Sequence, residues 1–226
     1  MVCQLHGGLT NQSFLVADGD DRAVVRINRQ DSYHLGIDRQ REISVHRALA
    51  DATYVPDVLL IDAGVQVSHY IAAQTVTAEM LQTPILRRQA LHNLAQIHAL
   101  ALPDAARFSY LRHCQVFARQ LPAARLRELD WTALAAAAHA IDNAEWTPVL
   151  CHHDLVVENI LLCDRGLFFI DWEYAGFGHP AFDAVKLFGA DGHIVDNYGR
   201  SVPLKTCDTL AYLQQGMEKI WYAVQD

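Results

Sequence analysis

The sequence lacks the features that mark membrane and secreted proteins. In its 226 residues, no apolar run approaches the roughly 18 residues that a membrane-spanning helix needs. Residues 1–15 lack the basic start and apolar core of a secretory signal. We therefore expect a protein that does not use a membrane as its partner.

Cysteine is scarce and lacks any recognisable spacing. The five cysteines are odd in number and form no C-x-x-C pair, which favours reduced thiols in the cytoplasm over a disulfide framework or a zinc site. The twelve histidines show no H-E-x-x-H or other ligand spacing. The cysteines and histidines thus indicate a cytoplasmic protein without a structural metal.

Positive charge is also under-represented, with 18 Lys and Arg against 26 Asp and Glu and a formal net charge of −8. A nucleic-acid-binding surface would need clustered cations, so we expect no nucleic-acid partner. A positively charged small molecule fits this charge better, although only the field inside a cleft acts on a substrate. The hydrophobic share of 51% allows a substantial core in one domain or in two lobes.

Polar side chains with a regular spacing lie between residues 149 and 183. His152, Asp154 and Asn159 spell H-x-D-x-x-x-x-N, and Asp171 follows twelve positions after Asn159, at the end of an apolar run. We predict short strands at 149–150, 160–163 and 167–170, which would bring these side chains to one edge of a hairpin. Phosphoryl transfer needs such a set, with one carboxylate for the attacking hydroxyl and an amide plus a carboxylate for magnesium.

This loop, followed by I-D-W-E-Y-A-G and then F-D, resembles the aminoglycoside phosphotransferase and choline kinase superfamily, especially its choline/ethanolamine and thiamine kinase branches. The resemblance implies an α+β, protein kinase-like fold with two lobes: a small antiparallel sheet with one helix, and a larger, mainly helical lobe. It also implies ATP and Mg²⁺ as cofactors.

The same resemblance assigns roles to individual residues. It makes Asp154 the catalytic base in a loop that begins at His152, makes Asn159 and Asp171 the magnesium ligands, and makes Asp183 a buried brace of the loop. The alternative is that His152, Asp154 and Asn159 are ordinary turn residues, since Asp and Asn are common at strand ends.

The N-terminal part reads as three strands, at 2–6, 13–17 and 22–27. The turn containing Gly7, Gly8 and Asn11 resembles the nucleotide-binding turn of the thiamine and choline kinase branch. A glycine pair lets backbone amides approach a phosphate closely, although an ordinary hairpin turn would look the same. Members of the family usually carry more residues before this turn, so we expect the first strand to be short or the N-terminus to be incomplete.

Arg26 stands where protein kinases have a lysine that holds the α- and β-phosphates, and a guanidinium can serve there as well. Glu42 follows in residues 38–52, whose mixture of apolar and charged positions predicts a solvent-facing helix. We predict an ion pair between Arg26 and Glu42. The alternative is a solvated helix face, on which Arg39 and Arg41 would look much like Glu42.

Two further strands are predicted at 58–61 and 65–71. The resemblance makes the end of the second a hinge, where backbone groups of His69, Tyr70 and Ile71 would meet the adenine edge. Beyond it the hydrophobic period changes from two to about 3.6, which places a lobe boundary near residue 72. We therefore expect a nucleotide-binding lobe at 1–71 and a lobe carrying the catalytic loop and substrate pocket at 72–226.

Helices are predicted at 85–100, 131–141, 181–188 and 205–224. In the last of these, Trp221 and Tyr222 could wall a pocket for a quaternary ammonium group, with Glu173 nearby, because aromatic faces attract such cations. At helical spacing the two aromatics could equally be core residues.

Together these features predict an ATP- and Mg-dependent phosphotransferase that acts on a small alcohol, most simply choline, ethanolamine or a thiamine-like compound. An aminoglycoside phosphotransferase is the alternative substrate class. A nucleotide-binding pseudokinase without turnover is the alternative outside enzymes, and the intact Asp154, Asn159 and Asp171 argue against it.

Overall fold

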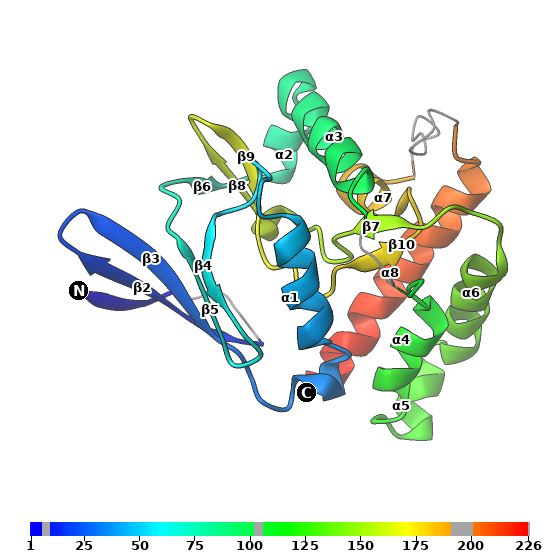
Figure 1. The fold of residues 1–226 in the computed structure, drawn as a ribbon. Coiled ribbons are helices and arrows are strands. Elements are labelled where there is room, and N and C mark those ends of the chain that lie inside the picture. The colour runs from blue at the N-terminus through cyan, green and yellow to red at the C-terminus, as the bar shows by residue number, and fades with distance from the viewer. Residues whose placement is uncertain (6–9, 102–105, 191–200, 226) are drawn as a thin grey trace.

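The computed structural model describes residues 1–5, 10–101, 106–190 and 201–225. It confirms the predicted two-lobed α+β architecture. An antiparallel sheet with one helix lies on one side, and a mainly helical part with short strands lies on the other (Figure 1).

The first sheet has the order β1-β2-β3-β5-β4, and all of its pairings are antiparallel. Its strands are β1 (Val2–Leu5), β2 (Gln12–Asp18), β3 (Asp21–Ile27), β4 (Val58–Ile61) and β5 (Val65–His69). A tight turn joins β2 to β3, and Gly19 adopts a positive φ of 58° there, which glycine reaches without steric cost. The strand predicted at 65–71 ends two residues early, at His69.

Helix α1 (Arg39–Ala48) follows the short 3₁₀ turn η1 (Ser32–Leu35). The helix starts at Asp38, whose carboxylate accepts hydrogen bonds from the amides of Gln40 and Arg41 and so caps the first turn. The prediction of a solvent-facing helix was wrong. Glu42 is only 1% exposed, because arginines from two elements neutralise it, and a sequence pattern cannot show such partners.

The second part contains most of the core. Its helices are α2 (Ala78–Leu81), α3 (Pro84–His98), α4 (Tyr110–Ala118), α5 (Ala123–Glu128), α6 (Trp131–Asn143), α7 (Phe182–Phe188) and α8 (Leu204–Gln225). Its strands are β6 (Gln74–Thr75), β7 (Val149–Cys151), β8 (Ile160–Cys163), β9 (Gly166–Phe169) and β10 (Gly176–Gly178). The predicted helices match α3, α6, α7 and α8 within a few residues, whereas α2, α4 and α5 were not predicted.

Two short sheets position the predicted catalytic segment. Strand β7 pairs with β10, and the hairpin β8–β9 extends β6 to a three-stranded sheet. A 3₁₀ turn, η2 (Val157–Asn159), leads directly into β8. The buried strand residues therefore lie immediately before and after the polar segment. The lobe boundary near residue 72 stays a prediction.

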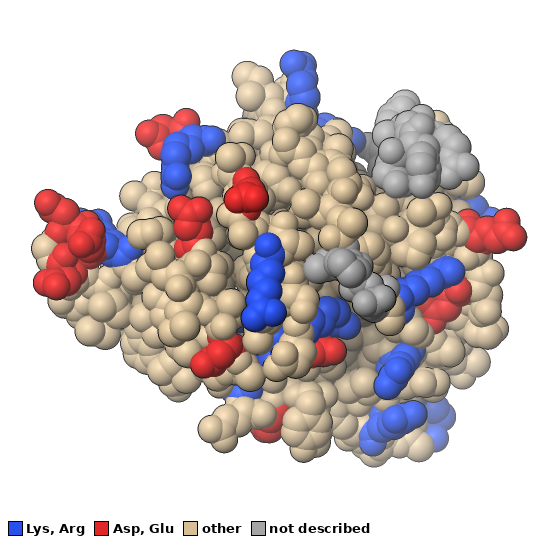
Figure 2. Space-filling view, in the orientation of Figure 1, with Lys and Arg blue, Asp and Glu red and all other residues tan. Residues whose placement is uncertain are grey.

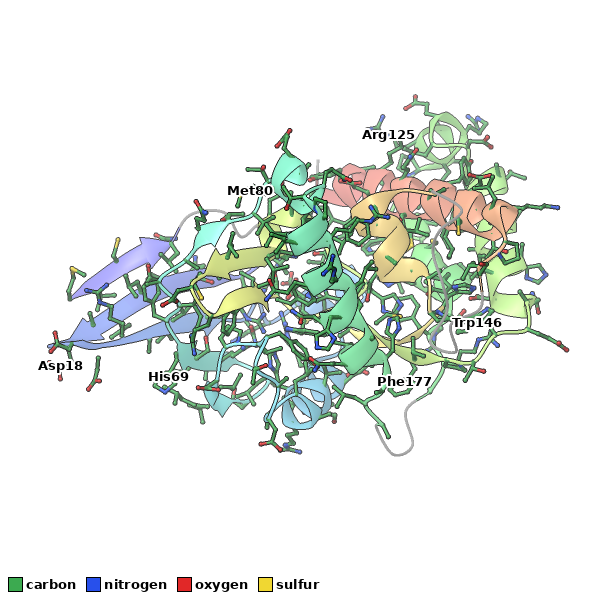
Figure 3. All side chains as sticks on the ribbon, turned by 90° about the horizontal axis from the view of Figure 1, so that it is seen from above. Asp18, His69, Met80, Arg125, Trp146 and Phe177 are labelled. Carbon is green, nitrogen blue, oxygen red and sulfur yellow. The ribbon has the colours of Figure 1, made fainter. Side chains whose placement is uncertain are left out.

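Charge is distributed unevenly over the two parts. Acidic side chains gather at the tip of the β2–β3 turn, whereas Lys and Arg are frequent toward the end that carries α4 and α5 (Figure 2). Seen from above, Asp18 lies at the left end of the molecule, and Arg125 lies at its upper edge, right of centre (Figure 3). Across the described part of the chain, no helix combines the length and apolarity needed to cross a lipid bilayer.

Candidate active site

The loop after β7 is held by a side chain from another element. The carboxylate of Asp183, on α7, accepts the amide of His152 at 2.7 Å and the amide of His153 at 3.0 Å. His153 has a positive φ of 66°, an uncommon conformation for a residue with a side chain. Asp183 is fully buried, so it acts as an internal anchor for the loop.

His152 is turned away from the solvent. Its Nε2 donates to the carbonyl of Ile170 at 2.9 Å, and its Nδ1 accepts the amide of Asp154 at 3.4 Å. Burial lowers the pKa of His152 to about 4, so the ring is neutral near pH 7. The structure places His152 as a link between the loop and the end of β9, and not at the cavity wall.

Asp154 and Asn159 lie side by side. The Nδ2 of Asn159 donates to the Asp154 carbonyl at 2.8 Å and to the Asp154 carboxylate at 3.3 Å. Burial and the neighbouring Asp171 carboxylate raise the pKa of Asp154 to about 7. A carboxylate tuned in this way is suited to accept a proton near neutral pH.

Asp171 faces this pair from the end of β9. It has a positive φ of 65°, and its Oδ1 accepts the Nη1 of Arg26 at 3.1 Å. Arg26 also forms the ion pair with Glu42 that the sequence predicted. Because the Arg26 and Glu42 side chains are 11% and 1% exposed, this pair links β3 to α1 inside the protein.

Arg39 is a site residue to which the sequence analysis gave no role. Its Nη1 donates to Glu42 at 2.7 Å and to Glu173 at 3.1 Å, and its Nη2 donates to Asn11 at 2.9 Å. Asn11 completes the cluster through a 2.8 Å bond from its Nδ2 to Glu173. One signal in the sequence was the excess of arginines in α1, but it does not say which of them points inward.

These contacts change the expectations for Asn11 and Glu173. Both polar groups of the Asn11 side chain are bonded within the protein, so this side chain ties the residue before β2 to the catalytic segment. Burial and the Asp171 carboxylate raise the pKa of Glu173 to about 7, while Asn11 and Arg39 hold its Oε2. Gly7 and Gly8 lie outside the described residues.

A cavity of about 380 Å³ opens beside these groups. Asp154, Asn159 and Asp171 line it, and so do the three residues predicted for substrate, Glu173, Trp221 and Tyr222. The full wall also includes Thr10, Phe108, His113, His153, Val156, Glu158, Tyr174, Phe182, Lys186, Gln214, Met217 and Glu218.

The aromatic side of the cavity is built from two elements. Trp221 on α8 donates its indole N–H to the Tyr174 hydroxyl at 3.0 Å, which fixes the ring. Tyr222 packs edge-on against Trp221 and stays 50% exposed. Neither is a fully buried core residue, so both rings are available to a ligand.

At the predicted hinge, two backbone donors are already used. The amide of His69 donates to Asp57, and the amide of Tyr70 donates to Arg22. Adenine recognition by these two amides is therefore excluded in this conformation. Among the three predicted residues, the buried Ile71 is the one whose amide remains a candidate.

The sequence from residue 2 to 202 matches the phosphotransferase enzyme family. The chain belongs to this family. Among curated relatives, protein LicA of Haemophilus influenzae is 30% identical over 196 residues, which cover 80% of this chain and 56% of the relative. The chain thus spans little more than half the length of that relative.

Solved structures confirm the fold of this phosphotransferase family member. Choline kinase LicA from Streptococcus pneumoniae superposes with a TM-score of 0.81 at 24% identity, covering 100% of this chain and 85% of the other. The GDP and kanamycin complex of APH(2″)-IIia superposes with a TM-score of 0.71 at 18% identity, covering 100% and 86%. At these identities the likeness concerns the fold alone.

The residues beside Asp154 suit a magnesium ion. Asn159 uses its Nδ2 toward Asp154, which leaves its Oδ1 as an acceptor, and Asp171 contributes a carboxylate at the same wall. Amide and carboxylate oxygens are the ligands that this hard cation prefers. The donor set therefore fits the ion that the family resemblance implies.

Proposed function

We propose that the protein is an ATP- and Mg-dependent phosphotransferase whose acceptor is the hydroxyl group of a small, positively charged alcohol. One observation carries this proposal. Asp154, Asn159 and Asp171 share a single cavity with Glu173 and the two α8 aromatics, so a proton acceptor, metal-binding oxygens and a cation-binding wall meet in one place.

The chemistry follows from the positions of these side chains. Asp154 orients the substrate hydroxyl and accepts its proton while the hydroxyl oxygen forms a bond to the γ-phosphorus of ATP. The bond from that phosphorus to the β–γ bridging oxygen breaks, and its electron pair leaves with ADP. Magnesium, when bound by Asn159 and Asp171, supplies charge neutralisation at the phosphates.

The Arg26 side chain is placed to serve the nucleotide. It spans Glu42 and Asp171, and from this position its fork of donors can be directed at phosphate oxygens. Arg39 and Asn11 bond to each other and to Glu173, so the Asn11 side chain is committed to contacts within the protein. Gly7 and Gly8, which lie outside the described residues, remain the residues proposed to approach the nucleotide phosphates.

The wall chemistry supports a cationic acceptor. Carboxylates and aromatic faces both attract ammonium groups, the latter by about 0.5 to 2 kcal/mol per ring. Choline, ethanolamine and thiamine combine such a group with a primary hydroxyl, which makes them the first candidates. Relatives named as choline kinase and ethanolamine kinase point to the same substrates.

An aminoglycoside is the second candidate substrate, because it is also a polycationic alcohol and the kanamycin complex shares the fold. The decisive experiment measures ATP consumption, with the protein and Mg²⁺, on choline, ethanolamine, thiamine, kanamycin and matched neutral and anionic alcohols. We expect kcat/KM to be at least about tenfold higher for the best cationic alcohol, a margin of about 1.4 kcal/mol. A neutral sugar that wins at low and high salt contradicts the cationic acceptor, and no turnover on any alcohol contradicts the enzyme.

A further inference from the structure

The cavity wall is strongly unbalanced in charge. Among its described residues there is one Lys or Arg, Lys186. The carboxylates of the same wall are Asp154, Glu158, Asp171, Glu173 and Glu218. A cation in this wall works against the binding of a cationic acceptor, so its presence calls for a reason.

Lys186 is tied closely to the catalytic loop. It lies on α7, one helical turn after Asp183, the residue whose carboxylate accepts the amides of His152 and His153. Its side chain is 20% exposed, and its Nζ donates to Glu218 on α8 at 3.4 Å. Lys186 and Asp154 line the same cavity, so the ammonium group belongs to the wall that carries the proposed site of attack.

The catalytic loop itself supplies no positive charge. Residues 154–159 read D-L-V-V-E-N, without Lys or Arg. Arg26, which the proposed function assigns to the nucleotide phosphates, is held by Glu42 and Asp171 and lies outside the cavity wall, so it leaves the acceptor side without a cation. The transferred phosphoryl group carries charge on three oxygens in the transition state, and a fixed cation beside those oxygens is an effective catalyst.

We propose that Lys186 is a further catalytic residue, which contacts the transferred phosphoryl group as it moves from ATP to the acceptor and then binds the phosphate of the product. The proposal rests on the proposed function. The hydroxyl proton goes to Asp154 and the electron pair of the broken bond leaves with ADP, so Lys186 acts through charge and takes no part in the proton transfer. Glu218 holds the ammonium group until the phosphoryl group competes for it.

The competing interpretation is an ordinary ion pair that joins α7 to α8. Pairs as exposed as this one contribute about 0 to 1 kcal/mol to stability. The two interpretations differ in what the loss of Lys186 changes. A structural pair affects unfolding and leaves ligand preference alone, whereas a phosphate contact affects the phosphorylated product more than the free alcohol.

The test compares Lys186→Met, Lys186→Arg and the control Lys219→Met, which removes an exposed lysine of α8. With the best acceptor from the panel, we expect Lys186→Met to lower kcat by about 10²-fold and to leave the KM for the alcohol within about twofold. Lys186→Arg should recover most of the loss, because the charge is retained. Lys219→Met should match the wild type.

Binding measurements complete the test. Measured by calorimetry, Lys186→Met should lower the affinity for the phosphorylated alcohol about tenfold or more. Its affinity for the free alcohol should change little. In the wild-type background, Glu218→Gln should raise the affinity for the phosphorylated alcohol. Combined with Lys186→Met, it should have no such effect. Equal affinities of both ligands in wild type and Lys186→Met would overturn the proposal while the turnover of the wild type upholds the proposed function.

Discussion

The five-stranded sheet and the two short sheets around the catalytic segment differ in how deeply their residues are buried. No residue of β1 to β5 is buried, and all of them are half-buried or exposed. By contrast, every residue of β7 is buried, and so are three of the four residues of β9. The hydrophobic core therefore lies with the catalytic segment, and the first sheet contributes little to it.

Polar contacts hold the two regions together at the site. Arg26 on β3 donates to Asp171, and Asn11, directly before β2, donates to Glu173. Arg39 on α1 joins Glu173 as well, and it also bonds to Glu42 on its own helix. The interface between the regions is thus made of the groups that surround the reaction, so changes at the site will be felt both in activity and in the attachment of the sheet.

The largest effect is expected from a substitution in the catalytic segment, at the proposed proton acceptor. Asp154→Ala should lower turnover by about 10²- to 10⁴-fold, because it removes the proton acceptor, and nucleotide affinity should stay close to that of the wild type. Steady-state kinetics and nucleotide titration measure the two quantities. Asp164→Ala, in the exposed β8–β9 turn, is the control. Near-wild-type turnover of Asp154→Ala would remove this residue from the mechanism.

The burial difference is tested by one pair of matched substitutions. Phe169→Ala, at a position that is 0% exposed, should lower the free energy of unfolding by about 3 to 5 kcal/mol. Phe14→Ala on the half-buried β2 should cost only about 1 kcal/mol, because it removes less area from water. Urea denaturation measures both. Similar costs at the two positions would show that the first sheet is packed more tightly than its exposure indicates.

The polar contacts between the five-stranded sheet and the catalytic segment, called the polar joint here, are tested at Arg39. Arg39→Gln leaves the buried Glu42 and Glu173 with fewer donors, so we expect a loss of about 1 to 3 kcal/mol in unfolding free energy. The exposed Arg47, on the same helix, gives the control Arg47→Gln. If both variants unfold like the wild type, the joint does not depend on Arg39.

The smallest effect concerns acid sensitivity. His46 on α1 is buried with both ring nitrogens unpartnered, and burial lowers its pKa to about 4, with Glu42 opposing the shift. Between the ordinary pKa of about 6.5 and this value, the unfolded chain takes up a proton that the folded protein does not. Stability should therefore fall with decreasing pH, and His46 should contribute about 1 kcal/mol of that loss between pH 7.5 and 5.5.

The measurement compares the urea midpoints of wild type and His46→Leu at both pH values. The substitution should flatten the dependence, whereas His92→Leu, at an exposed position of α3, should not. An unchanged pH dependence in His46→Leu would show that His46 is protonated equally in the folded and unfolded states.

Much of this fold could be predicted from local patterns. Alternating strands, the turn at Gly19 and the long periodic helices α3, α6 and α8 all follow from short-range preferences. Helix α4 was not predicted, although its buried residues Tyr110, Cys114, Phe117 and Ala118 recur at helical spacing.

The candidate site, too, could be predicted only in part from the sequence. The spacing of Asp154, Asn159 and Asp171 pointed to one place, and the structure brings them to one wall. Arg39 could not be separated from Arg41 or Arg47 by sequence, because its selection depends on Glu173, which lies 134 positions away. The inward turn of His152 likewise depends on a backbone carbonyl of another strand end.

The anchoring of the loop by Asp183 means that the active site is not a portable motif. A fragment that ended before Phe182 would contain Asp154, Asn159 and Asp171, yet it would lack the carboxylate that orients two consecutive amides of the loop. Grafting residues 149–175 onto another scaffold would transfer the reacting groups without the Asp183 carboxylate that holds them in this arrangement. An isosteric Asp183→Asn exchange would also leave the loop poorly held, because the side-chain carboxamide has one oxygen where two backbone N–H groups need acceptors.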